Sequence, residues 1–259
     1  MNKQKIIVAN FKMNLTLKFE LNHWLDDFSQ KIKTINFSQT DLVLCPPIIH
    51  LQTFIDRVKN NSSIAIGGQD CFWERKGSYT GAVSPASIYS LGGRYVILGH
   101  SERKKYFGET APIINLKLKA SSKVGLKSIV CVGETAEEKQ KDLTSQIINQ
   151  QLDNYLKDFP LGQLDRLLIC YEPVWAISSN NPTNPPTVDE IMTAKLIIKK
   201  KIVEKYGAKA GDKIRILYGG SVNQGNVEEV CLEAGMDGVL VGKASLVPNE
   251  ILGMVKKIS

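Results

Sequence analysis

One pattern repeats along the whole chain: a short apolar run is followed by a longer amphipathic stretch. The apolar runs are rich in Val, Ile and Leu and occupy residues 6–10, 42–45, 64–67, 95–99, 128–132, 167–171, 214–218 and 238–241. Their apolar residues are continuous rather than alternating, which predicts strands buried on both faces, as in parallel sheets. The stretches between them, such as 135–156 and 188–206, carry apolar residues at helical spacing.

Eight strand–helix units in 259 residues average about 32 residues each, which is close to the size of a βαβ unit. No Pro-, Gly- or Ser-rich linker interrupts the series, so we expect a single domain over residues 1–259. Eight parallel strands, each followed by a helix, predict an α/β protein with a closed (β/α)8 TIM barrel. A doubly wound sheet is the alternative, but no G-x-G-x-x-G motif opens any helix.

The composition is that of a folded globular protein, with 43% hydrophobic and 23% charged residues. No segment approaches the roughly 20 consecutive apolar residues that a membrane span needs. The first apolar run, at 6–9, is too short for the core of a signal peptide. We therefore expect a soluble, cytoplasmic protein without a membrane partner.

Neither the cysteines nor the charges indicate a special class of protein. The five cysteines are scattered and form no C-x-x-C pair, so reduced, buried thiols are expected rather than disulfides or a metal site. The formal net charge is +7, but the basic clusters at 103–105 and 199–201 are short and lack interleaved aromatic residues. We expect solvated helix faces and no nucleic-acid partner, while the positive field would attract a small anionic substrate.

Polar residues follow several of the predicted strands at the point where each strand ends. Asn10 and Lys12 follow the first strand, His100 and Glu102 the fourth, and Glu172 the sixth. In a (β/α)8 barrel the carboxyl ends of all strands meet at one mouth, where active sites lie. The sequence therefore predicts that these five side chains converge.

Seven stretches, in order and each at its own strand end, resemble the triosephosphate isomerase family over essentially the whole chain. They are Val-Ala-Asn-Phe-Lys-Met-Asn at 8–14, Leu-Cys-Pro-Pro at 44–47, Gly-His-Ser-Glu-Arg at 99–103, Cys-Val-Gly-Glu-Thr at 131–135, Tyr-Glu-Pro-Val-Trp-Ala-Ile at 171–177, Tyr-Gly-Gly-Ser-Val at 218–222 and Asp-Gly-Val-Leu-Val-Gly at 237–242. The resemblance implies interconversion of dihydroxyacetone phosphate and glyceraldehyde 3-phosphate. It also implies a homodimer that needs no cofactor and no metal.

The reaction needs a base above a carbon next to a carbonyl, and the resemblance gives this role to Glu172. Under Pro173, Val174 and Trp175 we expect its carboxylate to be desolvated and more basic than in water. His100 is expected to begin a helix at Ser101. The positive end of that helix disfavours imidazolium, so His100 would donate from a neutral ring.

The remaining catalytic roles also follow from the resemblance. Lys12 is the cation expected to balance the substrate phosphate and the developing enediolate. Asn10 would orient Lys12 and form a hydrogen bond near the reacting oxygen. For Glu102, electrostatic support of the site and a purely structural pairing are both open.

Phosphate binding is expected from backbone N–H groups at four positions, Ser178, Ser221, Gly242 and Lys243. The last two follow the eighth strand and Ser221 follows the seventh, which is where (β/α)8 barrels commonly bind phosphate. Lys243 stands where the family usually has a second glycine, and its charge could add to the attraction of phosphate.

Two segments depart from the family pattern. Residues 178–187 contain three prolines where the family has a short Gly-Thr-Gly lid, and prolines restrict hinge motion. The segment at 77–82, which in the family projects into the partner subunit, ends in Ala82 where a glutamate is usual. The segment still predicts a dimer, but the lost carboxylate leaves the details of the interface open.

These departures leave two alternatives beside a triose phosphate isomerase. The first is an isomerase of a four-carbon ketose phosphate, because the segment at 178–187 differs from the family lid. The second is a barrel that binds phosphate ligands without catalysis, since a barrel by itself does not fix function. The presence of Lys12, His100 and Glu172 together argues against the second.

Overall fold

The strands of the chain form a closed parallel barrel. The structure is a computed structural model that describes residues 4–177 and 184–259. Its strands are β1 (Lys5–Asn10), β2 (Thr40–Cys45), β3 (Ile64–Gly68), β4 (Tyr95–Leu98), β5 (Lys127–Val132), β6 (Leu167–Tyr171), β7 (Arg215–Tyr218) and β8 (Gly238–Val241). Each pairs in parallel with the next, and β8 pairs with β1. This confirms the predicted (β/α)8 barrel.

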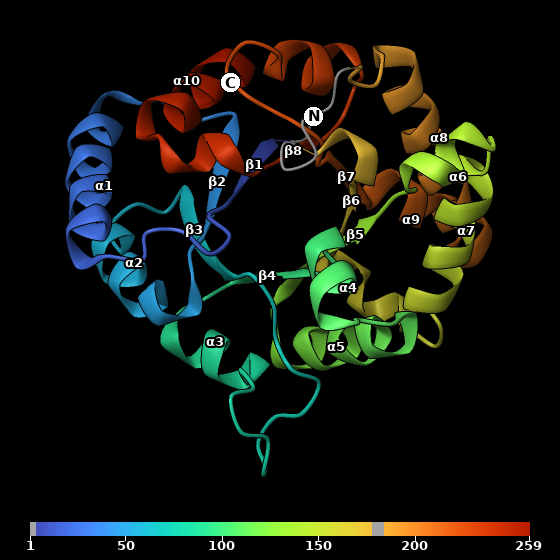
Figure 1. The fold of residues 1–259 in the computed structure, drawn as a ribbon, viewed down its shortest axis with the longest axis horizontal. Coiled ribbons are helices and arrows are strands. Elements are labelled where there is room, and N and C mark those ends of the chain that lie inside the picture. The colour runs from blue at the N-terminus through green and yellow to red at the C-terminus, as the bar shows by residue number, and fades with distance from the viewer. Residues whose placement is uncertain (1–3, 178–183) are drawn as a thin grey trace.

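Helices surround the barrel on its outer side (Figure 1). They are α1 (Lys18–Lys31), α2 (Leu51–Val58), α3 (Pro85–Leu91), α4 (Ser101–Phe107), α5 (Ala111–Val124), α6 (Ala136–Gln140), α7 (Thr144–Tyr155), α8 (Val188–Tyr206), α9 (Ala208–Lys213) and α10 (Pro248–Ile258). A π-helix, Glu228–Glu233, lies between β7 and β8. Within the described residues, no helix has the length and apolar character needed to cross a membrane.

The predicted helical stretches differ in how well they match the structure. The stretch 188–206 is α8, which begins after a capping box formed by Thr187 and Glu190. The stretch 135–156 is divided into α6 and α7, because Asp142 has a left-handed backbone with φ 54° between them. Such a conformation cannot continue an α-helix, and apolar spacing alone does not reveal it.

The continuous apolar runs are explained by two separate layers of packing. Alternate residues of β1, Ile6 and Val8, belong to the cluster that fills the barrel interior. Ile7 and Ala9 point the other way and belong to the larger cluster between the strands and the helices. Both faces of each strand are thus buried, so no polar position alternates with the apolar ones. All five cysteines are buried and free, as predicted.

Glycine is required where β5 ends, because the backbone of the next strand lies directly against it. A Cβ at Gly133 would lie 2.1 Å from the carbonyl oxygen of Glu172. The two segments are joined by a hydrogen bond of 2.7 Å from the Glu172 N–H to the Val132 carbonyl. The backbone of Glu172 is therefore positioned by direct contact with the end of β5.

Replacing Gly133 with alanine should destabilise the barrel strongly, because the clash is with backbone that cannot rotate away. We expect Gly133→Ala to lower the free energy of unfolding by about 3 kcal/mol or more. Gly162→Ala is the matched control, since a Cβ there meets nothing within 4 Å and should change stability by less than about 1 kcal/mol. Urea denaturation of both variants measures the difference, and equal midpoints would contradict the close approach.

Candidate active site

Side chains from several strand ends meet around one small cavity at the carboxyl end of the barrel. Its lining residues are Asn10, Lys12, His100, Glu172, Ile177, Gly219, Gly220, Leu240 and Gly242. The structure thus brings together four of the five predicted polar side chains, and Glu102 joins them through Lys12. The cavity has a volume of about 20 Å³, which is room for about one water molecule.

The Glu172 carboxylate is buried and contacts donors from the junction between β4 and α4. Its Oε2 accepts the backbone N–H of Ser101 at 3.0 Å, and its Oε1 accepts the Ser101 hydroxyl at 2.9 Å. The Nε2 of His100 lies 2.9 Å from the same Oε1. Ser101 is the first residue of α4, so its N–H is one that the helix itself cannot use.

These partners decide the protonation of Glu172. Burial raises the pKa of the carboxyl. His100 lowers it, through the hydrogen bond and through its charge whenever the ring is protonated, and Lys104 and the Ser101 N–H act in the same direction. The net pKa is below the ordinary value of 4.5. The expectation of a more basic carboxylate is therefore wrong for this arrangement, because the contact with His100, with smaller contributions from Lys104 and the Ser101 N–H, outweighs desolvation.

His100 caps the N-terminus of α4, and this fixes the position of its ring proton. The Nδ1 atom accepts the backbone N–H of Glu102 at 3.2 Å, so Nδ1 carries no proton in this geometry. The proton of a neutral ring is then on Nε2, the atom that faces Glu172. The predicted helix start at Ser101 agrees with the structure.

Lys12 reaches the cavity from a backbone conformation that non-glycine residues rarely adopt. Its φ is 51°, and its N–H donates to Asn10 Oδ1 at 2.9 Å. The side-chain amide of Gln69 donates to the Lys12 carbonyl at 2.8 Å, so both sides of the turn are held. The ammonium group lies 2.6 Å from Glu102 Oε1. Asn10 and Glu102 thus contact Lys12, at its backbone and at its charge.

The predicted phosphate-binding positions differ in whether they are accessible to a ligand in this structure. Gly242 lines the cavity beside Lys12, since a Cβ there would lie 3.3 Å from Lys12 Cε. Lys243 is exposed at the start of a short 3-10 helix, Lys243–Leu246. The N–H of Ser221 donates to the Ala176 carbonyl at 2.8 Å. Ser178 lies outside the described residues.

The segment that follows Glu172 is anchored by a buried glutamate that the sequence analysis did not single out for chemistry. Glu134 Oε1 accepts the Tyr171 hydroxyl at 3.1 Å and the Trp175 indole N–H at 2.8 Å. The Glu134 carbonyl accepts the N–H of Val174 at 2.9 Å. Residues on both sides of Glu172 are therefore tied to the end of β5, so the carboxylate emerges from a fixed backbone.

Three further positioning residues were missed: Ser101, Gln69 and Glu134. Ser101 and Glu134 lie inside quoted motifs, directly after His100 and Gly133, so their place next to the strand ends was an available signal. Gln69 directly follows β3, and the same strand-end rule could have found it. The sequence could not identify the hydrogen-bond partners of these three residues, because the contacts join residues 37 to 71 positions apart.

One mouth of this (β/α)8 barrel holds a carboxylate, an imidazole N–H and an ammonium group, and together these groups indicate a class of enzyme. Such a barrel can remove a proton beside a carbonyl while a cation stabilises the oxyanion, as an isomerase of a small anionic carbonyl compound must. Over residues 5–258, the chain matches the family model described as triosephosphate isomerase. It belongs to the triosephosphate isomerase family.

Curated relatives agree along the whole length of the chain. A protein of Dictyoglomus thermophilum named triosephosphate isomerase is 37% identical over 254 residues, covering 98% of this chain and 99% of that protein. A protein of the same name from Thermodesulfovibrio yellowstonii is 41% identical over 253 residues, with the same coverage. The chain is an intramolecular oxidoreductase that interconverts dihydroxyacetone phosphate and D-glyceraldehyde 3-phosphate, a step of glycolysis.

The lowered pKa of Glu172 should make its contribution to stability depend on pH. The folded carboxyl binds its proton at lower pH than the unfolded one, so acidification favours unfolding. The contribution is complete above the ordinary value of 4.5 and is lost as the pH falls through the lowered pKa. We expect Glu172→Gln to be less stable than the wild type at neutral pH by about 1–3 kcal/mol, and the gap to narrow below pH 4.5. Thermal unfolding of both proteins across pH measures this; a gap that stays constant or widens on acidification would contradict it.

Proposed function

We propose that Glu172 and His100 carry out the proton transfers of the isomerisation as a base and donor pair. The observation that carries this proposal is the 2.9 Å separation between Glu172 Oε1 and His100 Nε2 at the barrel mouth. The carbon that loses a proton is directly bonded to the carbonyl carbon, so base and oxygen donor must be neighbours. Glu172 takes the proton from carbon, and the Nε2–H of His100 stabilises the oxygen of the enediolate.

Substrate binding requires the polar contacts at the mouth to exchange. A triose phosphate does not fit a cavity of about 20 Å³, and the Glu172 carboxylate is held by Ser101 and His100. When the carboxylate moves from His100 and Ser101 to the substrate carbon, it loses the main contacts that lower its pKa. Burial then dominates, and the carboxylate becomes a stronger base at the moment when it is needed.

Lys12 supplies the positive charge for the substrate phosphate and the enediolate. Its ammonium group lies between Glu102 and the Gly242 backbone, so it can face an anion bound at the end of β8. Asn10 keeps the strained turn of Lys12 in place, and Glu102 holds the ammonium group until an anion competes for it. Both are positioning residues in this scheme.

The phosphate group would be held by backbone N–H groups at Gly242, Lys243 and Ser221, with Ser178 beyond the described residues. Lys243 adds a charge at the edge of this site. The Ser221 N–H becomes available only if it releases the Ala176 carbonyl. Since Ala176 lies four residues after Glu172, phosphate binding would move the same segment that carries the base.

The triose is the substrate that the comparisons support, because the family model and the curated relatives carry the name triosephosphate isomerase. No observation favours the four-carbon ketose phosphate or the non-catalytic barrel. The cytoplasm is the proposed location, since triose phosphates are intermediates of glycolysis.

The catalytic assignment is tested by Glu172→Gln, which keeps the shape of the side chain and removes the base. We expect kcat for triose phosphates to fall by about 10²–10⁴-fold, while the affinity for glycerol 3-phosphate changes by less than about threefold. A coupled assay gives kcat, and calorimetric titration gives the affinity. Glu233→Gln, an exposed glutamate on the π-helix, is the control and should retain full activity.

The same assay separates the alternatives. Faster turnover of a tetrulose phosphate than of the triose by the wild type would favour the four-carbon substrate. Binding of glycerol 3-phosphate without turnover of either would favour the non-catalytic barrel. Undiminished activity of Glu172→Gln would remove the base assignment.

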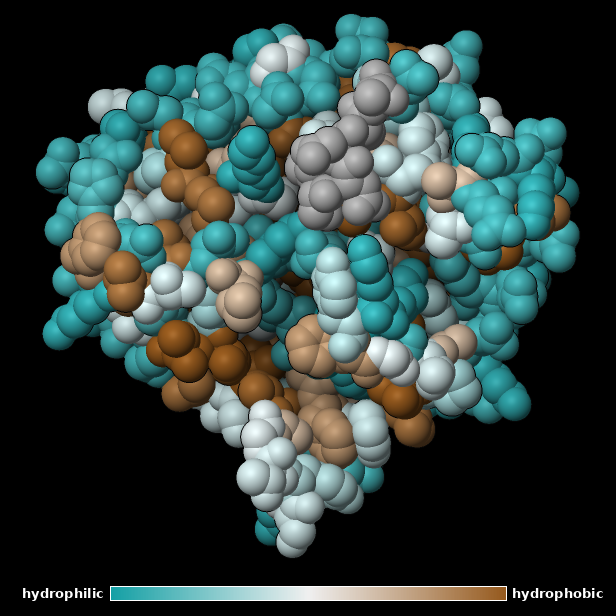
Figure 2. Space-filling view, viewed as in Figure 1, coloured by the Kyte–Doolittle hydropathy of each residue, from teal (hydrophilic) through white to brown (hydrophobic). Residues whose placement is uncertain are grey.

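A homodimer is the proposed assembly. The segment between β3 and α3 projects from the barrel, and hydrophobic residues lie near its base (Figures 1 and 2). Two large apolar side chains beyond strand ends are mostly exposed in the single chain, Met13 at 87% and Ile49 at 76%. Met13 and Ile49 follow the neighbouring strands β1 and β2, so they are placed to form one apolar surface that a second subunit would cover. Ala82 is exposed on the projecting segment and offers the partner no charge.

Charge at these positions should prevent association. We expect the variant Met13→Arg/Ile49→Arg to be monomeric where the wild type is dimeric, because the charges would be buried unpaired. Light scattering coupled to size exclusion measures the mass. Leu196→Arg is the control, since Leu196 on α8 is 62% exposed and should leave the dimer intact. A wild type that is itself monomeric at micromolar concentration would contradict the proposal.

A further inference from the structure

A second, much larger cavity lies at the end of the barrel opposite the active site. Among its lining residues are the first residues of four neighbouring strands: Tyr95 of β4, Lys127 of β5, Leu167 of β6 and Arg215 of β7. The strands are parallel, and the catalytic side chains lie at their other ends. The cavity volume is about 670 Å³, within the range of roughly 300–1,000 Å³ that is usual for small-molecule sites.

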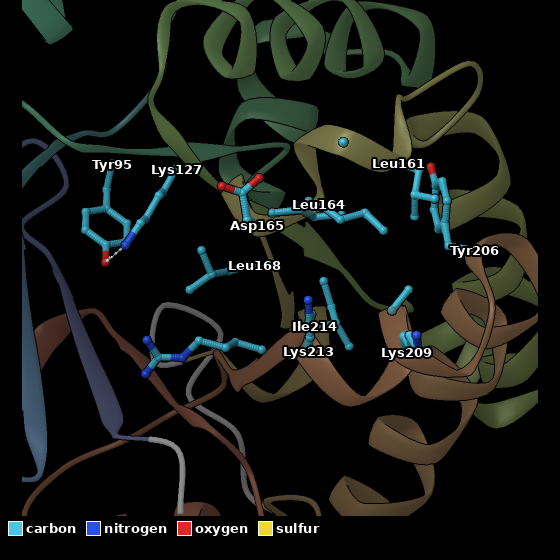
Figure 3. A pocket seen from close by; sticks show the side chains of 14 residues that line it. Tyr95, Lys127, Leu161, Leu164, Asp165, Leu168, Tyr206, Lys209, Lys213 and Ile214 are labelled. Atoms are coloured by element: carbon cyan, nitrogen blue, oxygen red, sulfur yellow. Dashed lines mark hydrogen bonds between the residues drawn. The ribbon is translucent and has the colours of Figure 1, made fainter. Parts of the chain in front are cut away.

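The walls of this cavity are largely apolar and include two aromatic rings. Tyr95 lies at one side, Tyr206 and Leu161 lie at the opposite side, and Leu164 and Leu168 lie between them (Figure 3). The Tyr206 hydroxyl donates to the Phe159 carbonyl at 3.0 Å, which fixes the ring. Leu161 is 61% exposed although it lines the cavity. A flat apolar molecule would cover Leu161 and contact the tyrosine ring.

The polar groups of the cavity are mainly cationic. Four basic side chains line it, Lys127, Lys209, Lys213 and Arg215, and the only acidic side chain among its lining residues is Asp165. Within the described residues, no ion pair involves Lys209 or Lys213. The site therefore has an excess of positive charge that an anion would balance.

Arg215 adds a further cation at the start of β7. One of its terminal nitrogens donates to the Gln4 carbonyl at 2.5 Å, and the other lies 3.7 Å from Asp41 Oδ2. Its Nε is buried and has no hydrogen-bond partner in the part of the chain that the structure describes. Because the Nε is buried, Arg215 contributes its positive charge to the cavity rather than this donor.

We propose that this cavity binds a small aromatic anion of the mononucleotide type, with its ring against the Tyr206 and Leu161 wall and its phosphate among Lys209, Lys213 and Arg215. Aromatic side chains stack on nucleobases, and lysine and arginine bind phosphate. The site is separate from the catalytic mouth, so the proposal does not depend on the isomerase mechanism.

The probe is adenosine 5′-monophosphate, titrated by calorimetry into the wild type while excess glycerol 3-phosphate occupies the active site. We expect saturable binding at one site per chain. Adenosine and inorganic phosphate should each bind at least about tenfold more weakly, because each supplies only half of the contacts.

Two variants with matched controls locate the site. Lys209→Glu/Lys213→Glu should weaken binding by about tenfold or more, because two of the three proposed phosphate contacts become repulsive. Its control is Lys18→Glu/Lys59→Glu, two exposed lysines at the start of α1 and directly after α2 that do not line the cavity. Leu161→Asp should weaken binding by about threefold or more, and Leu196→Asp should not. All four variants should keep isomerase activity, which reports that the barrel is folded.

Each contrary result would overturn the proposal. Absence of saturable binding to the wild type would do so directly. Loss of binding when glycerol 3-phosphate is added would place the nucleotide in the active site instead. If the two lysine variants weaken binding equally, the loss of affinity comes from the net charge of the protein and not from contacts in the cavity. If Lys209→Glu/Lys213→Glu leaves the affinity unchanged, the nucleotide binds elsewhere.

Discussion

The pairing of β8 with β1 is the contact on which the rest of this structure depends, because it closes the sheet into a barrel. The register places Gly238 opposite Ile6, and a Cβ at Gly238 would lie only 2.0 Å from the Ile6 carbonyl oxygen. Closure leaves no strand edge exposed. It also brings the ends of β1, β4, β6 and β8 to one mouth, although the ends of β1 and β8, Asn10 and Val241, are 231 positions apart in the chain. The site exists only because the barrel is closed.

At that mouth, each charged group is held by another part of the site. Glu172 is held by the start of α4, and Lys12 is held by Asn10, Gln69 and Glu102. A buried carboxylate without such donors would be costly. The same donors keep the carboxylate ionised and make it a weak base, so it is less reactive in the protein without bound substrate. Substrate binding must therefore exchange hydrogen bonds as well as fill space.

The cavities at the two ends of the barrel differ in size and in the pairing of their charges. The catalytic mouth is small and its charges are paired, whereas the opposite cavity is large and its cations outnumber its acids. The difference follows from what closes each end. Loops carrying Lys12, His100 and Glu172 fold over the carboxyl ends of the strands. At the amino ends, the first residues of β4 to β7 are left facing α9 and the segment before β6.

The sequence by itself determined the barrel, because strands buried on both faces leave continuous apolar runs, and it located Lys12, His100 and Glu172 through their places at strand ends. The bounds of α8 also followed from the apolar spacing, and the start of α4 from the place of His100 directly after a strand. Tertiary structure decided the rest. Asp142 divides α6 from α7, the approach of His100 reverses the expected shift in the pKa of Glu172, and the Ala176 carbonyl accepts the Ser221 N–H. The physical reason is that periodicity reports burial, whereas protonation and hydrogen bonding depend on donors brought from other strands by closure of the barrel.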